Sequence, residues 1–456
     1  MLERLFRLSA HGTDVRTEIL GGLTTFLTMA YIVVVNPAIL SFAGIPSGPS
    51  TTATILTAVF GSLLMGFYAN RPIAVAPYMG ENAFVAFGLT AMGIAWPQAL
   101  GAVFLSGLLF VAATLFGVRA WLAAAISPSL KHSFAGGIGL FMALIGLYEA
   151  GIVTSAVVGM PAQALLDATG RLRPPDVPLK IGELHDTRVL LALFGLLLTA
   201  SLLARRVRGG LLIGMAATAL LGAALGYGAR PTAFVSVPLR GEYSLGGLAL
   251  SLDVSGALTF AALPALLTLF LMGFLDTLGT LLAVGAAGGL LDAKGDLPEI
   301  RKPMLVDALA CVFAGAVGTT TSGAYIESAT GIREGARTGL AAVTTGLLFA
   351  GSLFFLPLVE PLQRLKYVYA PTLVLVGLLM TASLGKIDFE DITEGLPAFA
   401  TVALMAFSYN IANGLTAGLL LYPVVKALAG RWRELHPGTL ALAGLCAAYY
   451  LFGLPH

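Results

Sequence analysis

The sequence predicts an all-α protein that crosses a membrane many times. Hydrophobic residues make up 57% of the chain and charged residues only 11%, whereas soluble domains carry about 25% charged residues. Apolar runs near the length of a membrane span, about 20 residues, recur from one end of the chain to the other. These observations exclude a sizeable soluble domain. The basic residues are scattered singly, so we expect no nucleic-acid partner.

The apolar runs predict 14 membrane spans in two sets of seven. The first set covers residues 17–40, 51–69, 73–91, 98–117, 132–150, 188–204 and 209–227. The second set covers residues 259–287, 303–317, 321–336, 338–357, 370–385, 396–427 and 436–453. The stretch 396–427 is long enough for either one tilted span or a short helical hairpin broken between Asn410 and Gly414.

Two sets of seven spans indicate an internal repeat. Because seven is odd, the second copy must enter the membrane from the opposite side, which gives an inverted repeat, a common plan among transporters. An offset of 245 residues places Tyr31 against Asp276 and Asn82 against Glu327. The loops predict the orientation: Arg4, Arg7, Arg16, Arg71 and the basic run 204–210 all fall on one side. Cytoplasmic loops are rich in Lys and Arg, so we expect a cytoplasmic N-terminus and place the loop 151–187 outside.

The third span of each set carries residues that interrupt a helix. In RPIAVAPYMGENAF (71–84) two prolines and a glycine precede the polar pair Glu81–Asn82. In VGTTTSGAYIES (317–328) two glycines, three threonines and a serine precede Glu327. We expect short extended segments that become helical at mid-membrane, where irregular backbone is tolerated only if it is buried in protein or lines a cavity. Two converging helix N-termini would offer free N–H groups to one small ligand.

Two carboxyl groups stand within these otherwise apolar spans. Asp276 is the only charged side chain between Asp253 and Asp292, and Glu327 follows the second interrupted stretch. Ionisable groups inside a membrane cost roughly 3 kcal/mol on insertion scales and persist mainly where they handle a substrate or a proton. The two acids therefore predict a transporter, with proton coupling through one of them.

The chemistry of these positions suits a planar heterocycle. Asp276 and Thr280 lie one helical turn apart and share a face. A carboxylate can accept from ring N–H groups, and the Asn82 amide matches an edge that presents both a donor and an acceptor. We therefore expect substrate contacts from Asp276, Glu327, Asn82, Thr280 and Glu81, with the flanking aromatic residues Tyr78, Phe84, Phe274 and Tyr325 as candidates for stacking on the ring. Asp307, near a span end, is expected to reach the interface instead.

Metal and cofactor chemistry is not expected. The five histidines are widely dispersed, and the chain has no HExxH motif. The two cysteines, Cys311 and Cys446, lie in apolar stretches and are interpreted as small buried side chains. An intramembrane enzyme would need a nucleophile–base pair or a metal set, and neither is present in the pattern. We therefore expect no cofactor, with H⁺ as the coupling ion and Na⁺ as an open alternative.

Four stretches resemble the nucleobase–cation symporter-2 superfamily, which includes uracil, xanthine and purine permeases. They are FLDTLGT (274–280), TTTSGAYIESATGIREGARTGL (319–340), APYMGENAFVAF (76–87) and LPAFATVALMAFSYNIANG (396–414). The closest likeness is to the adenine/guanine/hypoxanthine (AzgA-like) branch, and it covers essentially the whole chain. YIESATGIREGARTGL is the most specific part.

The resemblance implies 14 helices in two inverted seven-helix repeats. Residues 17–117 and 259–357 would form a core domain that carries the substrate, and 132–227 and 370–453 a gate domain that also forms a homodimer. Transport would be elevator-like and driven by proton symport in the cytoplasmic membrane. The family's base-binding acids fall on Asp276 and Glu327, and its polar residue of span three falls on Asn82. Thr280 occupies the position of a histidine in uracil-type members.

Glu81 departs from the family's pattern, since many members of this branch have an apolar residue before the span-three asparagine. A third acid at this place would change the proton stoichiometry, favour a base with an extra donor, or point away from the ligand, so the choice among adenine, guanine and hypoxanthine stays open. The leading prediction is a proton-coupled purine importer. The alternatives are a uracil or xanthine permease of the same fold, an anion carrier of related architecture, which the acids disfavour, and a passive channel.

Overall fold

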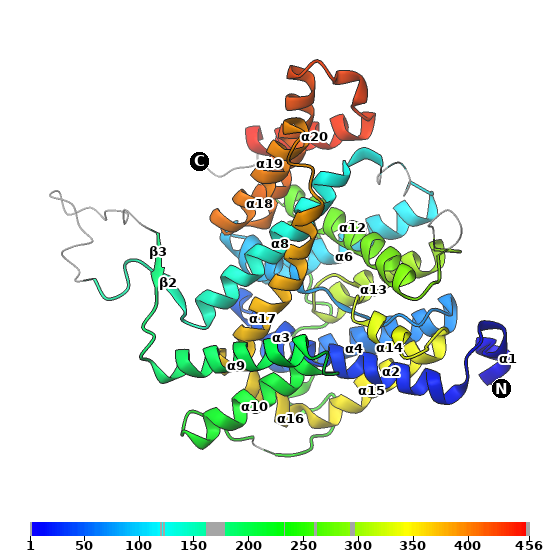
Figure 1. Cartoon of the computed structure of the whole chain (residues 1–456), viewed down its shortest axis with the longest axis vertical. Coiled ribbons are helices and arrows are strands. Elements are labelled where there is room, and N and C mark those ends of the chain that lie inside the picture. The colour runs from blue at the N-terminus through cyan, green and yellow to red at the C-terminus, as the bar shows by residue number, and fades with distance from the viewer. Residues whose placement is uncertain are drawn as a thin grey trace.

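The structure is a computed structural model, and it describes residues 2–118, 121, 124–160, 178–231, 233–259, 262–291 and 297–452. Almost all of its regular structure is helical (Figure 1). Among the described residues, nine helical stretches are long and apolar enough to cross a membrane, and three shorter apolar helices accompany them. The chain is therefore a helical, multi-pass membrane protein, as its composition predicts.

The helices follow the predicted spans closely. In the first half they are α2 (Val15–Met29), α3 (Ile32–Leu40), α4 (Ser47–Leu64), α5 (Met79–Ala83), α6 (Trp96–Leu115), α8 (Pro128–Glu149), α9 (Thr187–Ala204) and α10 (Gly210–Ala224). In the second half they are α12 (Leu263–Ala287), α13 (Arg301–Val317), α14 (Ser328–Arg333), α15 (Gly339–Ser352), α17 (Lys366–Thr381), α18 (Ile392–Phe407), α19 (Ile411–Leu428) and α20 (Pro437–Phe452).

Shorter elements complete the chain. They are the helices α1 (Leu2–Phe6), α11 (Val254–Ala257) and α16 (Leu356–Gln363), the π-helical turns η3 (Met65–Ala69) and η4 (Phe84–Leu89), and the strands β1 (Val75–Pro77), β2 (Val153–Ser155), β3 (Leu179–Ile181) and β4 (Ser322–Ala324). β2 and β3 pair as an antiparallel ribbon in the loop that the sequence places outside. Residues 161–177 of that loop, and residue 453 of the last predicted span, lie outside the described residues.

Two predicted spans are each divided into two helices. The stretch 396–427 is a hairpin of α18 and α19, and the break falls at residues 408–410, slightly before the predicted position. Tyr409 there has a positive φ of 53°, and the Asn410 side chain accepts from the Ala412 N–H to cap α19. The first span, predicted as one helix, is interrupted after Met29, and α3 starts at Ile32. Because the hairpin supplies two helices where one span was predicted, α19 becomes the seventh helical segment of the second half. α20, predicted as the seventh, is an additional helix after it.

Contacts divide the long helices into two sets. α4 packs on α13 and α15, and α6 packs on α12 and α13. In the other set, α8 packs on α17 and α18, and α9 packs on α10 and α17. In Figure 1 the first set occupies the centre and right of the view, and the second set the left and top. The two interrupted segments lie in the first set, where α5 also contacts α8 of the second.

Polar side chains fix the helix ends inside the first set. Glu18 of α2 is fully buried, and its carboxylate accepts from the backbone N–H groups of Arg337, Thr338 and Ala341 at the start of α15. The free N–H groups of a helix N-terminus need such partners when water is absent. This buried acid therefore has a structural role and is fully satisfied.

Candidate functional site

The two interrupted segments cross each other as short antiparallel strands. Val75 of β1 pairs with Ala324 of β4, and Pro77 pairs with Ser322. Tyr78 N–H donates to Thr321 O and Tyr325 N–H donates to Ala74 O, both at 2.9 Å. Each strand leads into a short helix, α5 or α14, as the breakers in the sequence predict. The pairing satisfies backbone groups that would otherwise be exposed in the membrane interior.

The hydrogen bonds also give the correspondence between the two halves. Ala74 and Thr321, like Tyr78 and Tyr325, are 247 residues apart and make equivalent bonds. The rings of Tyr78 and Tyr325 lie nearly parallel, 6.3 Å apart with an interplanar angle of 9°. These bonds correspond to an offset of 247 residues at the strands, close to the predicted 245.

Neighbouring helices anchor both strands through side chains. The Ser62 hydroxyl of α4 accepts from Val75 N–H at 3.0 Å and lies 3.2 Å from Val75 O. On the other side, Asp307 of α13 accepts from Ala324 N–H at 2.8 Å, and the Cys311 thiol donates to Ser322 O. Asp307 is fully buried, so the prediction that it reaches the interface is wrong. Its side chain holds β4 because that strand's backbone needs an acceptor there.

One face of α12 carries Asp276 beside open space. Gly273, Asp276 and Thr280 follow one another at helical spacing on this face. Gly273 is buried, yet no heavy atom lies within 4 Å of the position that a Cβ would take. Asp276 and Thr280 are partly exposed. The combination indicates an unfilled space along this face, next to the acid.

Glu327 lies at the wall of a cavity of about 600 Å³. Its carboxylate accepts from the Tyr31 hydroxyl at 3.0 Å, at the break between α2 and α3. The cavity is lined by Thr24 and Thr28 of α2, by Arg206, Arg208 and Leu211 at the junction of α9 and α10, and by Thr330, Arg333 and Glu334 of the α14 region. Pockets for small ligands have volumes of about 300–1,000 Å³, so this cavity is large enough to hold one.

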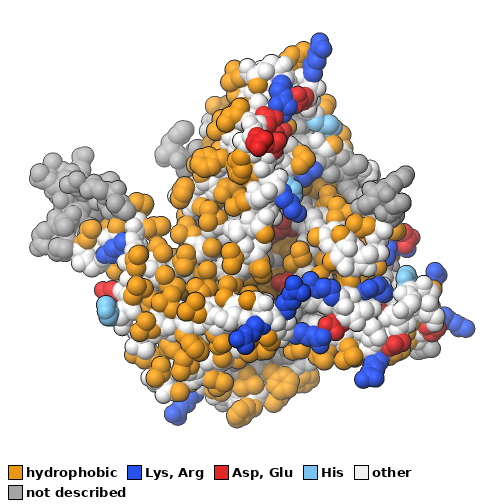
Figure 2. All heavy atoms as spheres, viewed as in Figure 1, with side chains coloured by type: hydrophobic (Ala, Val, Ile, Leu, Met, Phe, Trp, Pro, Cys, Tyr) orange, Lys and Arg blue, Asp and Glu red, His pale blue; other side chains and the backbone are white. Residues whose placement is uncertain are grey.

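Basic side chains surround the outer part of this cavity. Arg208 forms an ion pair with Glu334, which joins the α9–α10 junction to the end of α14. Figure 2 shows Lys and Arg side chains gathered across the middle of this face, with hydrophobic side chains covering the face to their left. These arginines come from the basic run that the sequence places in the cytoplasm.

Glu81 and Asn82 have a different environment from Glu327. Both are fully buried in α5. The Asn82 amide donates to Asn36 O at 3.3 Å, but its oxygen has no partner among the described residues, and neither oxygen of Glu81 has one. α5, which carries Glu81 and Asn82, contacts α12, which carries Asp276. Unpaired buried oxygens are rare in folded proteins and call for an explanation such as a water, an ion or a functional role.

The four predicted aromatic residues, Tyr78, Phe84, Phe274 and Tyr325, are all buried. The Tyr325 hydroxyl donates to Pro77 O at 2.5 Å, and the Tyr78 hydroxyl lies 3.0 Å from the Thr277 hydroxyl. Phe84 and Phe274 are fully buried. Phe274 packs edge-on against Phe110, and it stands two residues before Asp276, on the opposite side of the helix.

Three residues next to the predicted site residues were not predicted to belong to the site. Tyr31 binds Glu327, Thr277 binds Tyr78, and Gly273 borders the open space. The sequence offers little signal for them, because a tyrosine, a threonine and a glycine are ordinary in an apolar helix. Among the described residues, no group of three His, Cys, Asp or Glu is arranged to hold a metal ion.

A helical membrane protein with two interrupted segments that meet inside the membrane, and with acids next to internal space, has the architecture of a secondary transporter. The chain belongs to the nucleobase–cation symporter-2 family, because a model of this permease family matches residues 16–416. Its resemblance to that family, first seen in four stretches of sequence, is thus confirmed. The chain is a membrane permease and not an enzyme.

Curated relatives match along nearly the whole chain. A putative permease of Methanocaldococcus jannaschii is 41% identical over 99% of this chain and 98% of its own length. The adenine permease AdeP of Escherichia coli is 38% identical over 97% of this chain and 94% of its own. The guanine/hypoxanthine permease PbuO of Bacillus subtilis is 38% identical over 96% of this chain and 98% of its own.

Solved structures with a similar fold come from anion transporters. The transmembrane domain of the cyanobacterial bicarbonate transporter BicA superposes with a TM-score of 0.61 at 16% identity, over 88% of this chain and 97% of that domain. The murine anion transporter Slc26a9 gives 0.61 at 12% identity, over 91% of this chain and 68% of its own. At such identities the likeness concerns the fold alone.

Proposed function

We propose that this permease imports purine nucleobases such as hypoxanthine, guanine and adenine, and that protons drive the import. The observation that carries the proposal is the set of four carboxyl groups at the crossing of the two interrupted segments: Asp276, Glu327, Glu81 and Asp307. None of them forms an ion pair with a basic side chain in the described part of the chain. Such a site favours a neutral ligand rich in N–H donors, and it binds protons readily.

The names of the relatives support the choice of substrate. The proteins called adenine permeases and guanine/hypoxanthine permeases align with almost every residue of this chain. In this proposal Asp276 and Glu327 accept from ring N–H groups, and Asn82 and Thr280 contact the base edge. Tyr78 or Tyr325 stacks on the ring, whereas Glu81, Phe84 and Phe274 lie behind these contacts. Asp276 or Glu327 carries the coupling proton.

The pattern of helix contacts supports two inverted seven-helix repeats with 14 spans. If α2–α3 begins the first repeat and α12 begins the second, α4 corresponds to α13 and α6 to α15. The α6–α13 contact then has its counterpart in α15–α4. In the same way, α8, α9 and α10 correspond to α17, α18 and α19. The α8–α18 contact then has its counterpart in α17–α9, and the α9–α10 contact has its counterpart in α18–α19. Each repeat uses one interrupted segment as its third member, and α20 follows the fourteenth span.

The two packing sets fit a moving core and a fixed gate. The core would comprise residues 17–117 and 259–357, and the gate residues 132–227 and 370–453, with the gate forming a homodimer. Transport would proceed by sliding the core along the gate, in the manner of an elevator. With a cytoplasmic N-terminus in the inner membrane, the cavity beside Glu327 opens toward the cytoplasm, because Arg206 and Arg208 belong to a cytoplasmic loop.

A uracil or xanthine permease is the second candidate, because it shares the family and the two acids. An anion substrate is disfavoured despite the fold of the solved neighbours, since the carboxyl groups would repel it at the crossing. The two candidate functions differ in the size of the base and in the hydrogen-bonding groups along its edge. A competition experiment with unlabelled bases distinguishes them.

The test is uptake of radiolabelled hypoxanthine into proteoliposomes that contain the purified protein. We expect unlabelled adenine, guanine or hypoxanthine to compete, and uracil, bicarbonate and sulfate to leave uptake unchanged. Competition by uracil or xanthine alone would move the protein to the second candidate. Liposomes without protein serve as the blank, and an unchanged signal in them would identify passive leakage.

A further inference from the structure

We propose that the cavity beside Glu327 also binds a purine nucleoside monophosphate from the cytoplasm. The base lies at Glu327, the phosphate lies between Arg206 and Arg333, and the bound nucleotide stops transport. This regulation rests on the proposed import of purine bases and adds a second ligand to the same site. It follows from the different chemistry of the two ends of the cavity.

The inner end of the cavity offers hydrogen-bonding groups that suit a neutral base. The Glu327 carboxylate accepts from the Tyr31 hydroxyl at 3.0 Å and forms no ion pair within the described residues. The Thr28 hydroxyl of α2 and the Thr330 hydroxyl of α14 lie 3.2 Å apart on the same lining. Carboxylates accept from N–H groups, and hydroxyls both donate and accept, so this end matches the edge of a purine ring.

The outer end of the cavity carries an excess of positive charge. Arg206 and Arg208 line it from the junction of α9 and α10, and Arg333 lines it from the end of α14. Arg208 is paired with Glu334, but neither Arg206 nor Arg333 forms an ion pair in the described part of the chain. The planar guanidinium group binds phosphate oxygens through two parallel hydrogen bonds. The two remaining arginines therefore suit a phosphate group.

The size of the cavity suits a ligand larger than a base. Its volume of about 600 Å³ lies within the range of about 300–1,000 Å³ that is usual for small-ligand pockets. A purine base that contacts Glu327 leaves part of this volume unfilled. A ribose phosphate attached to the base fills the part that the arginines line, so one nucleotide uses both ends of the cavity.

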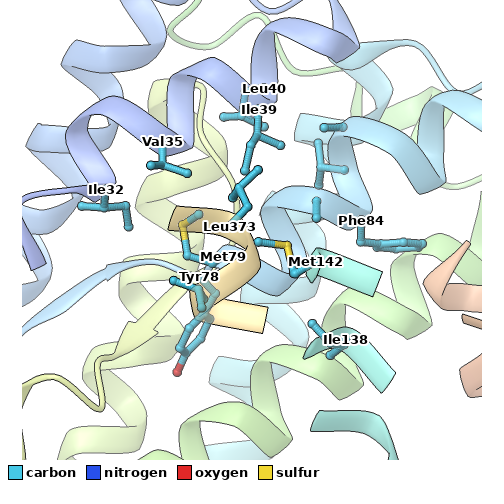
Figure 3. Packing of buried hydrophobic residues seen from close by; sticks show 14 of the residues in the cluster. Ile32, Val35, Ile39, Leu40, Tyr78, Met79, Phe84, Ile138, Met142 and Leu373 are labelled. Carbon is cyan, nitrogen blue, oxygen red and sulfur yellow. The ribbon is translucent and has the colours of Figure 1, made fainter. Parts of the chain in front are cut away.

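The side of the crossing that faces α8 is closed by apolar packing. A Cβ added to Gly80 of α5 would lie only 2.7 Å from the Ile138 side chain of α8. Figure 3 shows Met79 of the same segment near Met142 within this buried cluster. The cavity beside Glu327 is instead bordered by exposed arginines. A ligand that enters by this cavity therefore passes the arginines first.

The two arginines belong to parts of the molecule that transport would move relative to each other. Arg206 stands between α9 and α10, which pack together with α17 in the proposed gate. Arg333 ends α14, which packs on α2 and α12 in the proposed core. A phosphate bound to both side chains links gate to core. The nucleotide therefore holds the inward-facing arrangement and keeps the core from sliding.

The experiment is displacement of radiolabelled hypoxanthine from the purified, detergent-solubilised protein at low ionic strength. The competitors are inosine monophosphate, inosine and ribose phosphate. We expect inosine monophosphate to displace hypoxanthine at about tenfold lower concentration than inosine, because its phosphate gains two exposed charge pairs. High salt should remove this advantage by screening the charges. Ribose phosphate, which lacks the base, should displace little.

Variants of the two arginines test where the phosphate binds. Arg206→Ala and Arg333→Ala should each reduce the advantage of inosine monophosphate over inosine about threefold, and the double variant should abolish it. Both competitors are measured on the same variant, so a change in the binding of the base cancels in this ratio. Arg205→Ala, in the same loop but outside the cavity lining, is the matched control and should keep the full advantage.

Three outcomes would overturn the inference. Displacement by inosine monophosphate no better than by inosine would exclude a phosphate site, and this result needs no variant to fold. An unchanged advantage in the double variant would place the phosphate elsewhere. Uptake of radiolabelled inosine monophosphate into proteoliposomes would show that the nucleotide is carried and does not block transport. No binding of hypoxanthine at all would remove the proposed function as well, whereas hypoxanthine binding without competition by the nucleotide would remove this inference alone.

Discussion

The two interrupted segments share a backbone plan but differ in the surroundings of their acids. β1 with α5 and β4 with α14 pair residue for residue and exchange equivalent tyrosine N–H bonds. Glu327 is nevertheless partly exposed, bound to Tyr31 and located on a cavity wall, whereas Glu81 is sealed and unpaired. One backbone motif therefore places two carboxyl groups in different surroundings, one on a cavity wall and one in the sealed interior.

The largest effect should follow from neutralising the acids that are partly exposed. Glu327→Gln should weaken hypoxanthine binding about 10- to 100-fold, because hydrogen bonds to charged groups contribute about 1.5–3 kcal/mol. Asp276→Asn should abolish accumulation driven by a proton gradient. Both variants are tested by equilibrium binding of hypoxanthine and by its uptake into proteoliposomes. Uptake equal to that of the wild type in either variant would contradict the assignment of the site.

Filling the open space beside Asp276 should separate stability from transport. Gly273→Ala should raise the stability of α12 by up to about 1 kcal/mol, since glycine is a poor helix former, and should lower uptake about tenfold by intruding on the ligand. Gly351→Ala in α15, where a Cβ also meets no atom within 4 Å, is the matched control. Thermal unfolding and uptake of both variants decide the question; equal uptake in the two would show that the space beside Gly273 is not used.

Removing the hydroxyl that holds Glu327 should give a moderate effect. Tyr31→Phe should raise the KM for hypoxanthine about 3- to 10-fold, which corresponds to the loss of one hydrogen bond, while the amount of folded protein stays the same. Tyr148→Phe, a partly exposed tyrosine at the end of α8, serves as the control. An unchanged KM in Tyr31→Phe would show that this bond does not orient the carboxylate for the ligand.

The ion pair at the cavity mouth should matter least. Arg208 and Glu334 keep 60% and 33% of their side-chain surface exposed, and exposed pairs contribute about 0–1 kcal/mol. Arg208→Ala should therefore change the uptake rate by less than about fivefold, and the difference should shrink at high salt. Arg205→Ala, next in the same loop, is the comparison. A complete loss of uptake specific to Arg208→Ala would mean that the arginine contacts the ligand.

Much of the architecture could be predicted from the sequence. The length of the apolar runs placed the helices, and the prolines and glycines ahead of Glu81 and Glu327 located both interrupted segments. The break at Tyr31 could not be predicted, because the sequence around it is apolar and contains neither glycine nor proline within several residues. At the break, Tyr31 donates to Glu327, which lies 296 residues away in the chain, and a local pattern does not contain such a contact.

The details of the candidate site were harder to predict from the sequence than the helices were. The pairing of β1 with β4 could not be predicted, because the two halves share little sequence and long-range hydrogen bonds set the register of the strands. Asp307 was assigned to the interface because its neighbour in space, the N–H of Ala324, comes from another segment. The environments of Glu81 and Glu327 differ because α5 packs on α3, α8 and α12, whereas α14 packs on α2 and α12, and a linear pattern does not contain these contacts.

The most direct test of the central claim is hypoxanthine accumulation in proteoliposomes with an imposed inward proton gradient. We expect the wild type to concentrate hypoxanthine inside and an uncoupler to abolish the accumulation. Asp276→Asn should only equilibrate the base or fail to move it. Uptake that ignores the gradient and the uncoupler, or that requires Na⁺ at a fixed gradient, would contradict proton-driven purine import by this protein.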